Sequence, residues 1–361
     1  IVFTDSIPLL AIPFKAISSI LPNPFQYLGL WVLLCFVLQA YFAFRLIGLI
    51  SSSVAIQALG SIFFIFSPPL IFRLSLHESL MGHFIILAAL YLNLDQADSS
   101  TKVGARYKRL IAWIVLLSIA VLTHFYLAVM VLVLWIADLC NRTFVLKKVA
   151  FKDSLLEVGL VCVSIGFVAW QAGYFAIQGA SGATRGFGDF RTNLLALFNS
   201  RGWSYLLKPI PLRDSVEAAT GEGFQYLGAG SLLLMMAALY AVIKRKVNIC
   251  HAIKLLDKRY LLLLVALTLM TVISFSNRIG FGPWNFTIPL PDFIIGLLSL
   301  VRSSSRLFWP IYYMIVLALI WLVVKTYSYR VAMLILLCAA VIQIVDTSAG
   351  WLPIRAKVDL P

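Results

Sequence analysis

Apolar runs of about 15 to 25 residues recur along this chain and constrain its fold more than any other feature. A helix needs about 20 such residues to cross the ~30 Å hydrocarbon core of a bilayer. The chain is 61% hydrophobic and only 12% charged, so a soluble domain of this size would aggregate. The runs predict an all-α, polytopic transmembrane helical bundle. About ten spans are expected, at residues 25–49, 54–72, 80–94, 109–122, 125–139, 154–175, 225–243, 260–275, 308–324 and 331–345.

The polar segments between these runs divide the chain into regions. We expect an outer loop with an interfacial helix at 1–24, a transmembrane domain at 25–345 with outer loops at about 176–224 and 276–307, and an outer tail at 346–361. Ile1 begins inside a polar, proline-rich stretch, which predicts that at least one earlier span precedes it. The tail is expected to be truncated at Pro361.

Basic residues are sorted along the chain, which sets the expected orientation. The Lys-rich segments 95–109, 141–153 and 244–259 fall on one side when ten spans are counted. The positive-inside rule makes that side cytoplasmic. One long helix at 109–139 would place the basic segments before and after it on opposite sides. The positive-inside rule therefore favours a hairpin of two short helices with its tip at 123–126. The net charge of +14 then follows from loop charge, and no nucleic-acid partner is needed.

The predicted outer side differs from the inner side in its type of basic residue. It carries nine Arg and three Lys, against seven Arg and ten Lys on the inner side. Guanidinium groups hold phosphate oxygens in a bidentate fork, which Lys cannot do. The outer side is therefore where we expect a phosphate-bearing ligand and the chemistry.

The segment SPPLIFRLSLHESLMGH, between the second and third spans, carries Arg73 and His77 four residues apart on one expected helix face, with Glu78 and His83 nearby. His124 lies at the hairpin tip. Charged groups near membrane depth cost roughly 2.5 to 3.5 kcal/mol on insertion scales, so they usually pair or line a cavity. Two interpretations remain open: interfacial snorkelling with a local ion pair, or an anion site with a titratable neighbour.

Arg302 and Arg306 in RSSSRLFWPIYY repeat the four-residue spacing at the mouth of a span. These arginines are suited to binding a phosphate. The alternative is that they belong to an ordinary belt of interfacial residues at the membrane surface. The loop around GASGATRGFGDFRTN adds glycines to Arg185, Asp189 and Arg191, and Glu222 follows. Glycine at this density suits either a lid over a substrate or a flexible linker. No Gly-Lys-Ser/Thr follows, so the loop is not a P-loop.

Asp5 in FTDSIPLLAIPFK lies in an expected outer loop, before an expected interfacial helix at 7–21. A carboxylate at the membrane surface beside basic groups can act as a general base or a metal ligand. A divalent metal therefore stays open, and the sequence requires no cofactor.

These strings, together with LTHFYLAVM and EGFQYLG, resemble the GT-C superfamily of polytopic glycosyltransferases, which includes protein O-mannosyltransferases and aminoarabinose transferases. They resemble more closely an uncharacterised family of bacterial, GT-C-like membrane proteins. The resemblance covers most of the sequence. The paired acidic motif of the mannosyltransferases is absent here.

The resemblance implies a glycosyltransferase that moves a sugar from a polyprenyl-phosphate donor to a glycan, lipid or protein acceptor at the extracytoplasmic face of a bacterial inner membrane. Asp5 matches the place of the catalytic carboxylate. Arg73, His77, Arg302 and Arg306 are the kinds of residue that bind the donor phosphate. The alternatives are a transporter or flippase of a lipid-linked glycan and a non-catalytic envelope assembly subunit.

Overall fold

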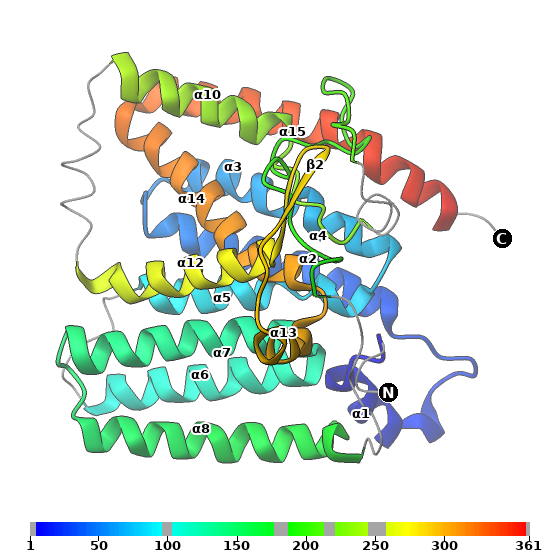
Figure 1. The fold of residues 1–361 in the computed structure, drawn as a ribbon, viewed down its shortest axis with the longest axis vertical. Helices are drawn as coiled ribbons and strands as arrows, with labels where there is room; N and C mark the ends of the chain where they lie inside the picture. The colour runs from blue at the N-terminus through cyan, green and yellow to red at the C-terminus, as the bar shows by residue number, and fades with distance from the viewer. Residues whose placement is uncertain (1–4, 96–102, 177–186, 213–220, 245–257, 359–361) are drawn as a thin grey trace. The chain divides into compact units, whose positions relative to one another are not determined.

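The computed structural model describes residues 5–95, 103–176, 187–212, 221–244 and 258–358, which are mostly helical (Figure 1). The chain separates into two compact units. Unit 1 comprises Ile1–Leu49, Arg73–Gly179 and His251–Ala266, and unit 2 comprises Ile50–Phe72, Ala180–Cys250 and Leu267–Pro361.

Unit 1 is a set of packed helices. Its helices are α1 (Pro8–Ala16), α2 (Leu28–Gly48), α5 (His83–Leu94), α6 (Val103–Thr123), α7 (Phe125–Cys140) and α8 (Phe151–Gln171). A π-helical turn at Asn141–Val145 extends α7, and 3₁₀ turns lie at Ser18–Ile20, Arg73–Ser75, Glu78–Met81, Tyr174–Ala176 and Lys258–Tyr260. Helix α5 packs against α2, α6 and α7, and α6 packs against α7 and α8 (Figure 1).

Unit 2 combines helices with a small sheet. Its elements are α3 (Val54–Ile65), α4 (Pro68–Phe72), α10 (Ala229–Lys244), β1 (Arg278–Phe281), β2 (Trp284–Thr287), α13 (Asp292–Leu298), α14 (Trp309–Thr326) and α15 (Tyr329–Val358), with 3₁₀ turns at Ser299–Val301 and Ser304–Phe308. Helix α12 (Leu261–Phe275) is divided between the units. Helix α15 packs against α3, α4, α10 and α14.

The close contact between α10 and α15 requires a glycine at position 230. A Cβ atom on Gly230 would lie 2.1 Å from the carbonyl oxygen of Ala339, so only glycine allows this approach. The backbone N–H of Ser231 then donates to Oε1 of Gln343 at 3.0 Å. Small residues at close helix contacts and polar side chains that bond across them are the usual means of helix association in membranes.

Six described helical segments are long and apolar enough to cross a membrane: Leu28–Gly48, Phe125–Val145, Phe151–Gln171, Lys258–Phe275, Ser304–Thr326 and Tyr329–Arg355. Four shorter apolar helices lie at Val54–Ile65, Glu78–Leu94, Ala229–Lys244 and Asp292–Val301. These features mark an integral membrane protein. The expected ten spans are not confirmed, because several of the predicted runs form helices too short to cross a bilayer alone.

The structure differs in detail from the expectations for three segments. The run at 54–72 is broken into α3 and α4 at Pro68 and Pro69, because proline lacks an N–H and clashes with the preceding turn. Residues 346–358 continue α15 and do not form a separate tail. The segment 276–307, expected as a loop, contains β1, β2 and α13.

The expected hairpin at 123–126 is confirmed, because α6 and α7 are separate helices that pack together. Its helices are longer than expected. Helix α6 has 21 residues, as does α7 with its π-helical extension, so each is about 31 Å long at 1.5 Å per residue.

A buried network of four charged side chains joins α6, α7 and α8. Arg109 donates to both oxygens of Asp138 at 2.6 and 3.1 Å, and Arg142 Nε donates to Asp138 at 2.9 Å. Arg142 also donates to Glu157 at 2.7 Å, and Trp113 Nε1 donates to Asp138 at 2.8 Å. The four formal charges cancel. Arg109 and Arg142, which we counted as loop charges, thus hold helices together.

The Asp138→Asn substitution should lower the free energy of unfolding by about 3–5 kcal/mol, because it leaves the buried guanidinium of Arg109 without its carboxylate, and Arg142 with Glu157 alone. The measurement is denaturant unfolding of purified protein in detergent. The matched control is Asp153→Asn, which removes a partly exposed pair with Arg106 and should cost less than about 1 kcal/mol. Equal losses in the two variants would contradict the structural role of the network.

Candidate functional site

Asp5, His77 and Ser79 meet in unit 1 and form what we call the N-terminal cluster. Oδ2 of Asp5 lies 3.1 Å from Nδ1 of His77. Ser79 donates its hydroxyl and its backbone N–H to Oδ1 of Asp5, at 2.5 and 3.2 Å. Two of the residues predicted from the sequence, 72 positions apart, therefore lie in direct contact.

Unusual backbone conformations flank this cluster. His77 has φ 65° and Ile7 has φ 44°, values that residues other than glycine rarely adopt. Trp31 Nε1 donates to the carbonyl oxygen of Glu78 at 2.8 Å and thereby ties the turn to α2. Strained residues persist only where surrounding contacts hold them, and they concentrate at functional sites.

The charge state of Asp5 follows from its contacts. Burial by itself raises the pKa of this carboxyl, but hydrogen bonds from His77 and Ser79 and the charge of His77 outweigh burial and lower the pKa from 3.8 to about 2. A carboxylate only accepts hydrogen bonds, so Nδ1 of His77 carries a proton. In the neutral tautomer that keeps this bond, the lone pair of the imidazole is on Nε2.

This arrangement changes the chemistry expected of Asp5. A carboxylate with a pKa of about 2 is a weak proton acceptor at neutral pH. It can instead orient the imidazole and stabilise the imidazolium that forms when Nε2 takes up a proton. The His77 side chain is 48% exposed, so its ring can meet a solute.

Arg73 and His83 are placed differently from what their spacing predicted. Helix α4 ends at Phe72, and His77 is left-handed, so Arg73 and His77 do not share a helix face. Arg73 is 1% exposed and His83 is fully buried. An anion in solution therefore does not reach either of them.

Glu78 and His124 have local structural roles. The carbonyl oxygen of Glu78 accepts the Trp31 bond described above. His124 is the N-cap of α7, where its Nδ1 accepts the backbone N–H of Tyr126 at 3.1 Å. Capping groups satisfy donors that the first helical turn leaves open.

Unit 2 contains a second cluster, in which Glu222 and Arg306 form a buried, two-bond ion pair at 2.7 and 3.0 Å. Ser305 donates its hydroxyl to the carbonyl oxygen of Glu222 at 2.8 Å and its N–H to that of Phe190 at 3.0 Å. Gly221 lies beside it at φ 67°. Two of the guanidinium nitrogens of Arg306 are held by Glu222, and its binding of a phosphate stays a prediction. The pair fastens the loop to the start of α14.

Arg302 remains suited to bind an anion. Its side chain is exposed, and its guanidinium carbon lies 4.9 Å from the ring centre of Phe190. A guanidinium held over an aromatic face still presents the N–H groups at its edge, and these can bind an anion. Of the two arginines predicted in this segment, Arg302 is the accessible one.

The described part of the glycine-rich loop is anchored. Asp189 pairs with Arg278 at 2.6 Å. Arg191 is fully buried and donates to the carbonyl oxygen of Gly188 at 2.6 Å and to Asn285 at 2.8 Å. Arg185 and the rest of the expected lid lie outside the described residues.

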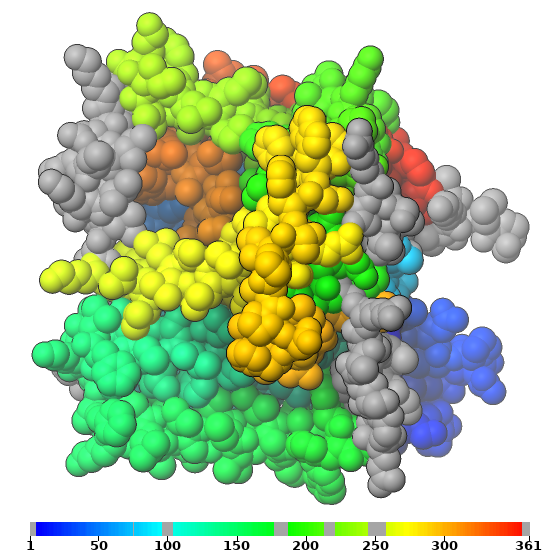
Figure 2. Space-filling model, in the orientation of Figure 1, coloured from blue at the N-terminus to red at the C-terminus, as the bar shows by residue number. Residues whose placement is uncertain are grey.

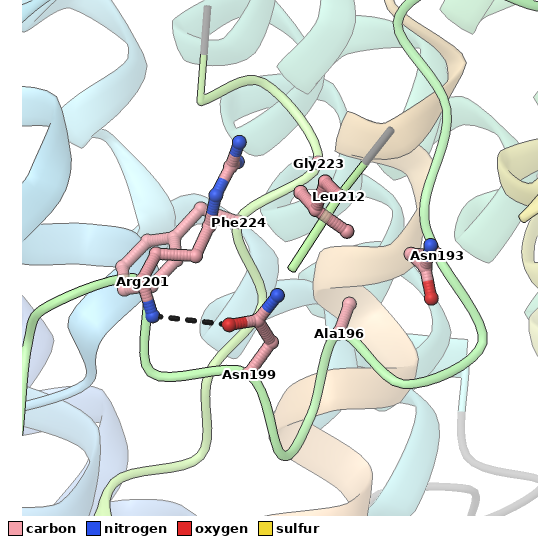
Figure 3. Close-up of a pocket in the computed structure, with 7 residues that line it drawn as sticks. All are labelled: Asn193, Ala196, Asn199, Arg201, Leu212, Gly223 and Phe224. Carbon is pink, nitrogen blue, oxygen red and sulfur yellow. Dashed lines mark hydrogen bonds between the residues drawn. The ribbon is translucent and has the colours of Figure 1, made fainter. Parts of the chain in front are cut away.

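A small pocket with a cavity volume of about 10 Å³, room for about one water molecule, lies in unit 2 (Figure 3). It is lined by Asn193, Ala196, Asn199, Arg201, Leu212, Gly223 and Phe224. The amide of Asn199 bonds to the backbone of Arg201 and Ile210, and that of Asn193 bonds to Gly282. None of the site residues predicted from the sequence lines it, and its two amides serve the loop fold.

The sequence reasoning missed Asp346, which is 2% exposed in α15. Its Oδ1 accepts bonds from the Ser204 hydroxyl at 2.8 Å and the Tyr205 N–H at 2.9 Å, and its Oδ2 accepts from Tyr226 at 3.2 Å. A signal was present, since an ionisable residue beside an apolar run is rarely without a partner.

No group of three or more metal-ligating side chains occurs among the residues that the structure describes. Asp5 and His77 together supply two potential ligands.

Comparisons with known proteins give one match. Residues 1–348 match the model of a family described as a domain of unknown function (DUF6311). The chain matches no curated protein and no solved structure.

The low pKa of Asp5 predicts a pH-dependent contribution to stability. The folded-state pKa of about 2 lies below the value of ~3.9 in an unfolded chain, so the contribution is full above about pH 5 and is lost as pH falls towards 2. The difference in melting temperature between the wild type and Asp5→Asn should therefore shrink below about pH 4. Thermal scans in detergent from pH 7 to pH 2.5 measure it, and a constant difference would refute the assigned contacts.

Proposed function

The chain belongs to the DUF6311 family, and we propose that it is an integral membrane glycosyltransferase that moves a sugar from a polyprenyl-phosphate-linked donor to an acceptor. The contact between Asp5 and His77 carries this proposal, because it unites a carboxylate with an imidazole that can accept a proton. The resemblance of the sequence to GT-C enzymes supports sugar transfer as the reaction.

The reaction needs one proton acceptor. As the acceptor hydroxyl forms its bond to the anomeric carbon, the bond from that carbon to the donor phosphate breaks, and the hydroxyl proton must leave. In our proposal Nε2 of His77 takes this proton, and Asp5 orients the ring through Nδ1. Asp5 therefore acts through His77, which modifies the role that the sequence suggested for it.

Arg302 is the residue we propose for the donor phosphate. A guanidinium group binds phosphate oxygens through charge-assisted hydrogen bonds. Its exposure and its stacking on Phe190 support this role. The sorted basic residues support an extracytoplasmic active face, and a bacterial inner membrane follows from the resemblance.

The alternative of a transporter receives less support from the spans. Polar side chains along a substrate path would be expected to face a cavity. Of the four candidates Gln39, Gln57, Asn93 and Gln343, the last three instead donate to backbone carbonyl oxygens at 2.8–3.1 Å, which supports a structural role for them.

Replacing His77 by Asn should lower kcat for sugar transfer by about 10²–10⁴-fold, the usual contribution of a general base. Asp5→Asn should lower it less, and the double variant should be no slower than His77→Asn alone, because Asp5 acts through His77. The assay follows transfer from a polyprenyl-phosphate sugar by purified protein in detergent. Asp153→Asn, a carboxylate paired elsewhere in unit 1, is the control. Full activity in His77→Asn would exclude the proposed base.

Replacing Arg302 by Ala should raise the apparent KM for the donor about tenfold or more, because one charge-assisted contact to phosphate is lost. The control is Arg330→Ala, which removes another exposed arginine. An unchanged KM, or an equal rise in both variants, would show that Arg302 does not bind the donor phosphate.

A further inference from the structure

One face of the hairpin β1–β2 is polar and anchors the hairpin to the protein. Oδ1 of Asn285 accepts a bond from the buried Arg191, and a Cβ atom on Gly280 would lie 2.8 Å from Nδ2 of Asn193. Arg278 pairs with Asp189. Side chains alternate along a strand, so these contacts assign the opposite face to the other residues of the hairpin.

That opposite face is apolar and exposed. Trp284 is 56% exposed and Phe286 is 60% exposed, and they lie two residues apart on β2. Phe281 is opposite Trp284 in the strand register, and their rings stack with centres 6.1 Å apart. Figure 2 shows the hairpin and α13 at the surface of the molecule. The usual arrangement of a half-buried hairpin is thus reversed.

Helix α13 and its 3₁₀ extension also turn large apolar side chains outward. Phe293, Leu297 and Leu300 are 76%, 66% and 69% exposed. Their spacing of i, i+4 and i+7 places them on one helix face, which in a soluble protein would be the face turned towards the core. Two neighbouring elements therefore present large apolar side chains outward.

The flanking helices place this segment at a membrane surface. Candidate spans end at Phe275 and begin again at Ser304, so the chain leaves and re-enters the membrane on the same side. The apolar helix Asp292–Val301 is only about 15 Å long and cannot span the ~30 Å core. Arg302 follows at its end.

We propose that β1–β2 and α13 form a lipid-inserted element, with Phe286, Phe293 and Leu297 in the acyl region and Arg302 at the level of the lipid phosphates. Exposed apolar surface of this extent marks an interaction site. Aromatic side chains and an arginine at its edge match the interface of a bilayer with anionic headgroups. This inference does not depend on the glycosyltransferase proposal.

Spin labels at single cysteines test the depth of the element. The whole protein, with its five native cysteines replaced by serine, is reconstituted in vesicles of phosphatidylethanolamine and phosphatidylglycerol. Labels at 286, 293 and 297 should collide with oxygen at least threefold more often than with a water-soluble nickel chelate. A label at Thr287, on the polar face, is the matched control and should show the reverse.

Two results would overturn the proposal. Labels at 286, 293 and 297 that favour the nickel chelate would put the element in water. Labels that are immobile and shielded from both reagents would show that protein, such as a second copy of the chain, covers it. A label at 302 at phosphate depth would support the assigned position of Arg302, and one exposed fully to the chelate would refute it.

Discussion

Hydrocarbon offers no hydrogen-bond partners, so polar side chains within membrane helices must find them inside the protein. The structure meets this constraint twice in the same way. In unit 1, Asp138 on α7 accepts bonds from an arginine and a tryptophan of α6 and from an arginine of the π-helical turn. In unit 2, Asp346 gathers donors from the loop before α10. Each carboxylate therefore fixes segments that apolar packing alone would leave free to slide.

The sequence predicted the helices of this chain well and its interruptions poorly. Apolar runs gave α2, α7, α8, α12 and α14 to within a few residues, because run length is set by the bilayer. The break at Pro68 was readable from the prolines. The hairpin β1–β2 carried a signal as well, since Gly282 at φ 55° and Pro283 separate two short alternating segments. That signal was hidden in a segment expected to be a loop.

The candidate site shows which residue properties a sequence reveals. Asp5 was singled out as a carboxylate in an expected outer loop and His77 for its four-residue spacing from Arg73, and the two lie in contact. Arg302 and Arg306 were equivalent by the same reasoning, yet one is exposed and the other is paired with Glu222. The difference comes from a residue 84 positions from Arg306, which local spacing does not reveal. Ser79 was missed because a hydroxyl gives no signal until its partner is known.

An exposed apolar face has a different meaning on a transmembrane helix than on a short helix between two spans. An exposed apolar face on a transmembrane helix such as α8 requires no further explanation, because lipid covers it. The same face on a ten-residue helix between spans requires one, because that helix is too short to be surrounded by the bilayer core. Since the polar face of β1–β2 is already used to hold Asp189 and Arg191, the hairpin cannot turn over to hide its aromatic side chains. Its orientation is fixed from the protein side, and the membrane surface is the partner that remains chemically matched to Trp284, Phe286 and Arg302.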